Sequence, residues 1–374
     1  MTGWKEEKLE NIFYIVKEVY KPSNEHQYKY VGLEHIEQGT LRLNGWGYSN
    51  SVQSNKYFFK KDDILFGKLR PYFRKVIKAP FDGVCSTDIW VCRAKKDFDQ
   101  NFLFYFLANQ EFIDTANSTD EGTRMPRADW NYLKKTTWII PPLPEQKAIA
   151  EVLSSFDDKI NLLTRQNKTL ENFAQAYFRK WFIEDACNKW EVGKLGDEFN
   201  ITMGQSPRGE TYNDLKIGLP FFQGKAEFGF RFPLEKQYCS EPIKIAEKFD
   251  TLLSVRAPVG ALNMAMYRCC IGRGLAVPIH KKGYKHYTFY KMKSLQEVFD
   301  TFDDDGTVFG SISREKFLSI DNVIPPEKLV CSFDNFARHI DLKIYENTIQ
   351  IRTLAKLRDT LLPKLINGEI RVKM

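Results

Sequence analysis

The chain has 374 residues, of which 43% are hydrophobic and 28% are charged, an ordinary balance for a globular protein. This length favours two or more domains, and the longest apolar runs fall short of the roughly 18 residues that span a bilayer. The net charge of +7 is a mild lean towards a polyanionic partner and proves nothing by itself.

The N-terminal sequence and the cysteine pattern both favour a cytoplasmic protein. The N-terminal residues 1–10 lack the apolar segment of a secretory signal, so we expect a cytoplasmic protein. Seven cysteines show no CxxC spacing and five histidines are scattered, which favours reduced, buried thiols over a metal site. We therefore expect neither a metal nor a cofactor.

Residues 1–140 have the pattern of a compact α+β domain. Short β-like runs such as YKYVGL and DIWVCR alternate with a helical stretch, NFLFYFLANQEFIDTA, and glycine and proline separate them. Between Lys56 and Lys78 lie eight Lys or Arg residues, two Asp residues and six aromatic residues. Such a basic, aromatic stretch suits phosphate neutralisation, although a solvated strand face with chance charge is the alternative.

Residues 141–186 begin with a double proline and continue as one long helix. Proline fixes φ and disfavours helix in the residue before it, so Pro141 and Pro142 end the preceding strand. Residues of the helix then recur at a strict 4-3 spacing, which is typical of a coiled-coil seam. The alternative is an amphipathic helix that lies on its own domain. The seam residues are Phe156, Ile160, Leu163, Asn167, Leu170, Ala174, Tyr177 and Trp181.

The second half of the sequence repeats the first. Pro141 and Pro325, Asp157 and Asp341, and Gly122 and Gly306 are all 184 residues apart. In addition, DDILFGKLRP resembles FDTLLSVRAP. We therefore expect a second α+β domain at 187–324 and a second helical segment at 325–374.

The second helix carries the same seam, and it predicts the pairing of the two helices. Its seam residues are Ile340, Ile344, Asn347, Ile351, Leu354, Arg358, Leu361 and Leu365. In an antiparallel pair, Asn167 then faces Asn347, so that the two buried amides satisfy each other and fix the register. We expect Arg358 to reach solvent at the edge of the seam. We also expect Pro363 to end the regular helix near Leu362, and a short turn and strand to follow.

These motifs resemble the specificity subunit of type I restriction-modification systems. IPPLPEQKAIAEVLSSFDDKI is similar to the first conserved region of that family, and LAKLRDTLLPKLINGEIRV is similar to the end of the second. MGQSPRGETYN followed by GLPFFQGKAEFG resembles one common type of target recognition domain. The resemblance covers essentially the whole chain.

The resemblance implies two target recognition domains separated by an antiparallel pair of long coiled-coil helices. Each domain reads one half of a bipartite site on double-stranded DNA. The helices fix the separation of the domains and dock two methyltransferase (modification) subunits, to which restriction subunits add in the full complex. The alternative is an orphan DNA-binding or scaffold protein without methyltransferase partners.

The sequence argues against catalysis by the chain itself. It has no NPPF or DPPY motif of an amino-methyltransferase, and GLPFFQGKA departs from a phosphate loop in spacing and in its last residue. The acidic run between Glu297 and Asp305 reads as a solvated loop. We therefore assign no catalytic residue, and a fused nuclease-methyltransferase fragment is disfavoured.

Candidate DNA contacts come from the basic stretches and from glycine-rich loops. From Thr251 to Lys293 there are eight Lys or Arg residues and no acid, so basic charge recurs at equivalent places in both halves. Arginine and glutamine suit base edges and lysine suits phosphates, and glycines such as Gly204, Gly209 and Gly224 let backbone approach closely. Tight structural turns are the alternative for any single residue. The candidates are Lys60, Lys61, Lys68, Arg70, Arg74, Thr123, Arg124, Arg127, Gln205, Ser206, Arg208, Tyr212, Gln223, Lys225, Arg256 and Arg273.

Overall fold

The computed structural model describes residues 3–22, 26–118, 125–186, 190–302 and 310–373. It divides into two compact units. The first unit comprises Met1–Asn161 and Ile351–Met374, and the second comprises Leu162–Gln350. Within the described ranges, no helix combines the length and the apolar character needed to cross a membrane.

The first unit contains three small sheets, and its sheet connections are mostly antiparallel. The four-stranded sheet has the order β2 (Phe13–Val16), β10 (Ile89–Ala94), β7 (Ile64–Gly67), β8 (Val76–Lys78). The five-stranded sheet has the order β3 (Val19–Tyr20), β6 (Lys56–Phe59), β9 (Gly83–Cys85), β4 (Lys29–Val31), β5 (Gly47–Tyr48), with β4 and β9 parallel. A separate pair joins β1 (Lys5–Lys8) to β11 (Thr137–Ile140).

Among the described residues of this unit, the short α-helices are α1 (Leu9–Ile12), α2 (Gln100–Ala108), α3 (Gln110–Asn117) and α4 (Trp130–Leu133). The side chain of Asp99 caps α2 by accepting a hydrogen bond from the backbone N–H of Phe102 at 2.8 Å. Residues 102–108 of α2 are all buried, so this helix is a core element rather than an amphipathic surface helix.

The second unit repeats this arrangement, except that the outermost strand of its five-stranded sheet lies at the other end of the sheet. Its four-stranded sheet has the order β13 (Phe199–Met203), β21 (Leu275–His280), β18 (Thr251–Ser254), β19 (Leu262–Met264). Its five-stranded sheet has the order β14 (Tyr212–Asn213), β16 (Tyr238–Cys239), β15 (Leu219–Phe222), β20 (Cys269–Ile271), β17 (Ile245–Ala246), again with one parallel pair, β15 and β20. The pair of β12 (Glu191–Lys194) and β22 (Asp321–Ile324) matches that of β1 and β11. Its short helices are α6 (Leu195–Glu198), α7 (Lys285–Ser294), α8 (Gln296–Asp300) and α9 (Arg314–Leu318).

One turn shows how closely the two halves correspond. Asp62 and Phe249, which the sequence repeat aligns, both adopt a left-handed backbone, with φ of 69° and 66°. In the first unit the Asp63 carboxylate accepts a hydrogen bond from the N–H of Lys60 at 2.7 Å, and in the second the Asp250 carboxylate accepts one from Glu247 at 2.8 Å. The repeat therefore extends to backbone strain and to side-chain capping.

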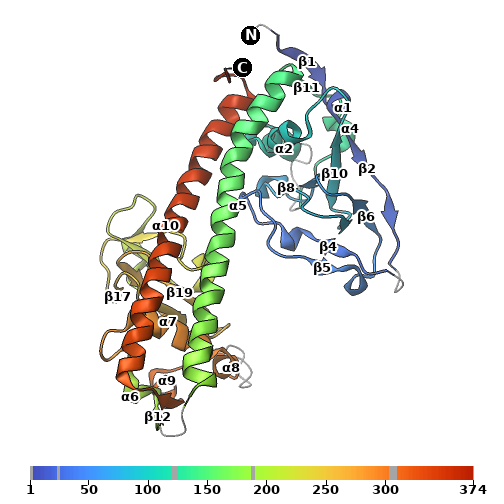
Figure 1. Ribbon diagram of the computed structural model, residues 1–374. Coiled ribbons are helices and arrows are strands. Elements are labelled where there is room, and N and C mark those ends of the chain that lie inside the picture. The colour runs from blue at the N-terminus through green and yellow to red at the C-terminus, as the bar shows by residue number, and fades with distance from the viewer. Residues whose placement is uncertain (1–2, 23–25, 119–124, 187–189, 303–309, 374) are drawn as a thin grey trace. The chain divides into compact units, whose positions relative to one another are not determined.

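Two long helices run through both units. Figure 1 shows α5 (Leu143–Arg179) and α10 (Glu327–Ile366) as unbroken helices. A single π-helical turn, Lys180–Glu184, extends α5.

The prediction that α10 ends near Leu362 is wrong. Pro363 lies inside the helix, which ends at Ile366, and Leu365 is buried in the core of the first unit. The lost backbone hydrogen bond at the proline is offset because the last turn buries Leu362, Leu365 and Ile366. The predicted C-terminal strand is also wrong, since residues 367–373 form turns and extended chain. Arg371 there binds the Glu145 carboxylate, at 2.8 Å for one of its two contacts.

Within each unit, α5 and α10 run antiparallel. In the first unit Glu145 pairs with Arg371, and twelve residues further along α5, Asp157 pairs with Arg358. In the second unit Asn167 bonds to Asn347, and further along α5, Tyr177 stacks on Phe336 with ring centroids 4.8 Å apart. In the second unit an advance along α5 therefore matches a retreat along α10, and in the first unit it matches a retreat from Arg371, beyond the end of α10, to Arg358 within the helix.

The expectation that Arg358 reaches solvent is wrong. Its side chain is only 2% exposed, and its guanidinium donates to the carboxylates of Asp157 and Asp359. A buried cation must be paired because the loss of hydration costs more than packing returns. The predicted seam is also incomplete near the C-terminal end of α5, where the side chain of Tyr177 is 38% exposed.

Candidate functional site

In the second unit, four loops meet at the ends of strands. We call this the second junction; its loops are residues 204–206, 223–225, 255–257 and 272–274. The Ser206 hydroxyl donates to Gln223 Oε1 at 2.9 Å and accepts from the N–H of Arg273 at 3.3 Å. The N–H of Gly274 donates to the Gln223 carbonyl at 3.0 Å. Three of the predicted DNA-contact residues therefore form one hydrogen-bonded cluster.

Glycines allow these loops to touch one another. A Cβ on Gly204 would lie 2.2 Å from the Gly272 carbonyl oxygen, and a Cβ on Gly274 would lie 2.6 Å from that of Gln223. The close approach at Gly204 is therefore made to the protein itself. Gly209 and Gly224 instead have open space around the position of a Cβ, which leaves them accessible to a ligand backbone.

Arg256 joins the second junction through its backbone neighbours. The N–H of Val255 donates to the Gly274 carbonyl at 3.0 Å, and Arg256 itself forms an isolated antiparallel bridge with Ser311. The Arg256 side chain is exposed. Gln205, Gln223, Lys225 and Arg273 are exposed as well. The cluster therefore presents amide and cationic groups to solvent from a fixed backbone.

The first unit has the same junction, built by equivalent hydrogen bonds. We call it the first junction; its loops are residues 31–33, 68–70, 86–88 and 126–128. The N–H of Lys68 donates to the Asp88 carbonyl at 2.9 Å, as that of Val255 does to Gly274. Leu69 bridges Arg127 in the position where Arg256 bridges Ser311.

Cationic side chains converge on the first junction. Lys68, Arg70 and Arg127 come from its two paired loops, and the N–H of Arg70 donates to the Pro126 carbonyl at 2.8 Å. Arg127 is exposed and its Nε lies 3.4 Å from Asp88 Oδ1. Arg70 has a left-handed backbone, with φ of 52°, and its guanidinium lies over the Phe73 ring. The candidates Thr123 and Arg124 lie outside the described residues.

Other predicted residues lie apart from the junctions. Lys60 and Lys61 are exposed on the turn before β7, whereas the first junction follows β7, so the strand separates the two groups. Arg74 is turned inward: its Nε donates to the Ala108 carbonyl at 2.7 Å and its guanidinium pairs with Asp359 at 3.2 Å.

Two more candidates of the second unit, Arg208 and Tyr212, make contacts with nearby residues of that unit. Arg208 is exposed and its Nη1 lies 3.7 Å from Glu210. Tyr212 stacks on Phe221 with centroids 4.7 Å apart, and its hydroxyl donates to the Pro207 carbonyl at 2.9 Å. Burial raises the pKa of Tyr212, so this hydroxyl keeps the proton that it donates.

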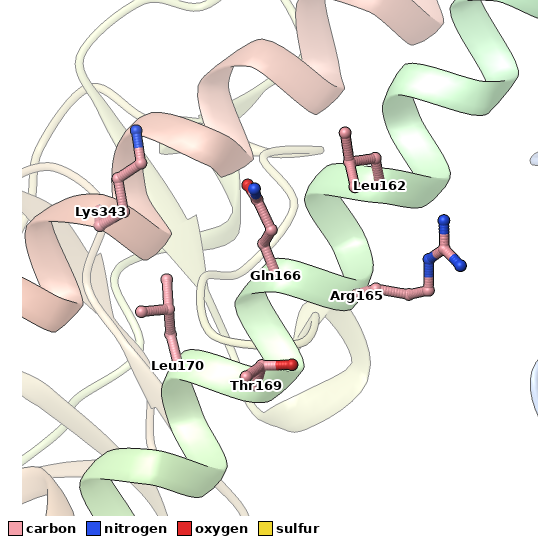
Figure 2. A pocket seen from close by; sticks show the side chains of 6 residues that line it. All are labelled: Leu162, Arg165, Gln166, Thr169, Leu170 and Lys343. Carbon is pink, nitrogen blue, oxygen red and sulfur yellow. The ribbon is translucent and has the colours of Figure 1, made fainter.

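The helices of the second unit carry an open groove and an aromatic patch. The groove encloses about 380 Å³ and is lined by Leu162, Arg165, Gln166, Thr169 and Leu170 of α5 and by Lys343 of α10. Figure 2 shows Gln166 and Leu170 on the side of α5 that faces α10, with Arg165 pointing away. Phe173 and Tyr177 are 47% and 38% exposed, and both contact Phe336. We call these three residues the aromatic patch.

Sequence reasoning missed the residues that hold the sheet-containing part of each unit to the long helices. Asp157 and Asp341 served only as evidence for the sequence repeat, and no role was predicted for them or for Arg231. The available signal was a charged residue repeated at an offset of 184 at a position outside the apolar seam. For Arg231, the signal was a lone cation in the apolar run FGFRFPL.

Comparison with known proteins identifies relatives along the whole chain. Residues 1–172 match the type I restriction modification DNA specificity domain. The chain is 28% identical to the putative type I restriction enzyme MjaX specificity subunit of Methanocaldococcus jannaschii, over 99% of this chain and 94% of that protein. It is also 28% identical to the type I restriction enzyme MjaIX specificity subunit of the same organism, over 80% of this chain and 72% of that one.

A solved structure supports the fold. The S subunit of a type I restriction-modification system from M. genitalium is 20% identical, with a TM-score of 0.60 over 100% of this chain and 97% of that one. Its likeness concerns the two mixed α and β domains and the long helices. Along its whole length the chain is therefore similar to specificity subunits of type I restriction-modification systems.

Proposed function

We propose that the chain is the DNA-specificity subunit of a type I restriction-modification complex, in which each junction reads one half of a bipartite DNA site. The observation that carries this proposal is the duplicated junction. Two units whose four-stranded sheets have the same strand order present polar and cationic side chains from equivalent loops. A protein that reads two separate half-sites needs such a pair of equivalent readers.

The chemistry of the side chains fits this division of labour. In the second junction, Gln223 and Arg273 bring an amide and a guanidinium, which form paired hydrogen bonds with adenine and guanine edges. In the first junction, Lys68 would neutralise phosphate together with Arg70 and Arg127 of the same paired loops. Lys60, Lys61, Lys225, Gln205, Ser206, Arg208, Tyr212 and Arg256 complete the proposed contacts, with Thr123 and Arg124 proposed from the sequence alone.

The helices serve as spacer and as docking surface in this proposal. Residues 1–140 and 187–324 act as the recognition domains, and residues 141–186 and 325–374 act as the helical spacers. Two methyltransferase subunits dock on the helices, and restriction subunits join through them in the cytoplasm. The groove and the aromatic patch support docking on the second unit, because exposed aromatic residues are enriched at interfaces. The chain supplies recognition, and the methyl transfer belongs to the partner.

Co-expression with a type I methyltransferase subunit tests the proposal. The complex is expected to purify with two methyltransferase subunits per chain and to methylate adenines at one bipartite sequence, which methylome sequencing would read. Phe173→Ser with Tyr177→Ser is expected to weaken the association, while the matched exposed change Tyr132→Ser in α4 leaves it intact. A chain that binds DNA specifically but never retains methyltransferase would instead be an orphan DNA-binding protein.

A further inference from the structure

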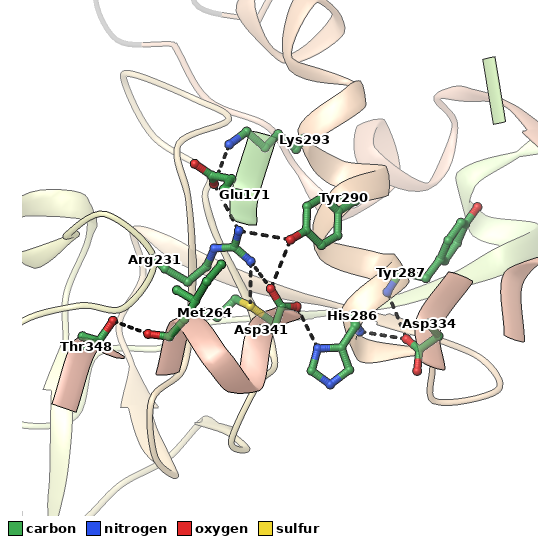
Figure 3. Close-up of polar contacts among 11 residues, drawn as sticks. Glu171, Arg231, Met264, His286, Tyr287, Tyr290, Lys293, Asp334, Asp341 and Thr348 are labelled. Atoms are coloured by element: carbon green, nitrogen blue, oxygen red, sulfur yellow. Dashed lines mark hydrogen bonds and ion pairs between the residues drawn. The ribbon is translucent and has the colours of Figure 1, made fainter. Parts of the chain in front are cut away.

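A buried ionic cluster lies in the second unit, away from its junction. The Arg231 side chain is 0% exposed and comes from the segment between β15 and β16. Its guanidinium donates to Asp341 of α10, to Glu171 of α5 at 3.2 Å and to the Tyr290 hydroxyl of α7 at 3.2 Å, as Figure 3 shows. It also lies over the Phe289 ring, 4.0 Å from its centroid. One side chain thus contacts both long helices and one helix of the recognition domain.

The carboxylates of the cluster have further partners. Asp341 also accepts a hydrogen bond from the Tyr290 hydroxyl at 3.1 Å and lies 2.8 Å from His286 Nδ1. Glu171 also pairs with Lys293 at 2.8 Å. Burial alone would lower the pKa of Arg231, but Asp341, Tyr290 and Glu171 raise it, so the guanidinium stays charged. Removing Arg231 would therefore leave Asp341 buried and short of a cation.

The first unit builds the equivalent anchor differently. Asp157, the counterpart of Asp341, accepts a hydrogen bond from the Tyr105 hydroxyl at 2.7 Å, and Tyr105 of α2 corresponds to Tyr290 of α7. Its cation, however, is Arg358 of α10 itself. The position equivalent to Arg358 in the second unit is Ala174, which is buried and carries no charge. Hence the ion pair of the first unit joins α5 to α10, whereas in the second unit the cation that pairs with Asp341 comes from the recognition domain.

We propose that Arg231 is a positioning residue that fixes the angle of the second recognition domain on the helices and so selects the length of the unread DNA spacer. The inference rests on the proposed function, because the spacer is defined only for a protein that reads two half-sites. A planar guanidinium with three partners on three elements leaves the domain no free rotation, whereas an ammonium on a flexible stem would. The expected effect therefore falls on spacing and leaves the bases read at either junction unchanged.

The test uses the full complex with methyltransferase and a library of sites with spacers of varied length. Arg231→Met alone leaves buried carboxylates and can reduce folding, so the decisive variant combines Arg231→Met, Glu171→Gln and Asp341→Asn. This triple variant is expected to fold and to methylate the same half-sites, while its preference for one spacer length over its neighbours falls at least tenfold. Arg179→Met removes an exposed ion pair with Glu184 on α5 and is expected to keep the wild-type preference.

Two failures are distinguishable. If the wild-type complex methylates no bipartite sequence, the proposed function itself is wrong. If the wild type selects one spacer and the folded triple variant selects it equally sharply, the positioning role of Arg231 is overturned. A triple variant that changes the bases read at a half-site would also overturn it, because Arg231 would then act on recognition rather than on spacing.

Discussion

Asn347 donates a hydrogen bond from its side-chain Nδ2 to Asn167 Oδ1 at 2.9 Å, between two helices whose surrounding seam positions are largely apolar. Both residues are buried, and Leu170, Ala174, Ile340 and Ile344 belong to the adjoining hydrophobic core. A register shifted by one heptad would separate the two asparagines and leave each amide without this partner. The hydrogen-bonded pair thus makes this register of the antiparallel helices more stable than the registers shifted by one heptad.

A double-mutant cycle measures how strongly Asn167 and Asn347 stabilise the protein together. Asn167→Leu alone is expected to lower the free energy of unfolding by about 1–3 kcal/mol, because Asn347 loses its partner in a buried layer. The double variant Asn167→Leu with Asn347→Leu is expected to recover most of that loss. Urea unfolding measures both, and Asn161→Leu at an exposed position of α5 is the control. Additive effects of the two changes would show that the bond does not couple the helices.

Two lysines of the first unit test which end of β7 faces DNA. Lys61 lies on the turn before the strand and Lys68 lies in the first junction after it. If the junction reads DNA, Lys68→Ala is expected to weaken binding to all sequences and to reduce the salt dependence by about one phosphate contact. Lys61→Ala is then expected to have the smaller effect. Binding measured at several salt concentrations decides, and the reverse ranking would put DNA at the other end of the strand.

Base reading in the second unit is testable at Arg256 and Gln223. Arg256→Ala is expected to relax preference at one position of one half-site, by about 1–3 kcal/mol if the arginine makes a paired contact with a base. Gln223→Ala removes the acceptor of the Ser206 hydroxyl as well, so its effect is expected to extend to the neighbouring position. Methylome sequencing reports both changes. Unaltered half-site preference in Arg256→Ala would remove that residue from base reading.

The helices and the repeat could be predicted from the sequence, because heptad spacing and a repeat at a fixed offset of 184 are patterns in the sequence itself that need no tertiary information. The end of α10 was not, since the burial of Leu365 in a core formed by distant residues outweighs the local cost of Pro363. The junctions were reached in part: Gln223 and Arg273 were named, but their convergence depends on hydrogen bonds between separate loops. Arg231 could have been singled out as a lone cation in an apolar run, but its partners could not, because they lie 59 to 110 residues away.

Acid should weaken the second unit through Glu198. This buried carboxylate at the end of α6 accepts a hydrogen bond from Asn322 at 2.8 Å and lies 3.5 Å from His280 Nε2. Burial would raise its pKa, but the contacts with His280 and Asn322 outweigh burial and lower it. A lowered folded-state pKa means that its contribution is present above the unfolded pKa of about 4.3 and is lost as pH falls through the folded value.

Glu198→Gln isolates that contribution. The stability difference between wild type and variant is expected to be constant near neutral pH and to shrink below about pH 4, where the wild-type carboxylate takes up its proton. Urea unfolding between neutral pH and pH 3.5 measures it. Glu227→Gln, at a partly exposed position of the same unit, is the matched control substitution. A difference that stays constant down to pH 3.5 would contradict the assigned direction of the shift.

Lengthening both helices together separates spacing from reading. Seven residues inserted at matching positions of α5 and α10 preserve the heptad seam and add roughly 10 Å to each helix at about 1.5 Å per residue. That length corresponds to about 3 base pairs of duplex at roughly 3.4 Å each. Because neither junction is touched, both half-sites are expected to survive and only the unread spacer is expected to grow, by at most that amount.

An insertion in one helix alone is the matched control; it breaks the register set by Asn167 and Asn347 and is expected to reduce stability without defining a new spacer. Methylome sequencing of the two variants decides the matter, and an insertion in both helices that changes the bases read would refute the role of the helices as a spacer.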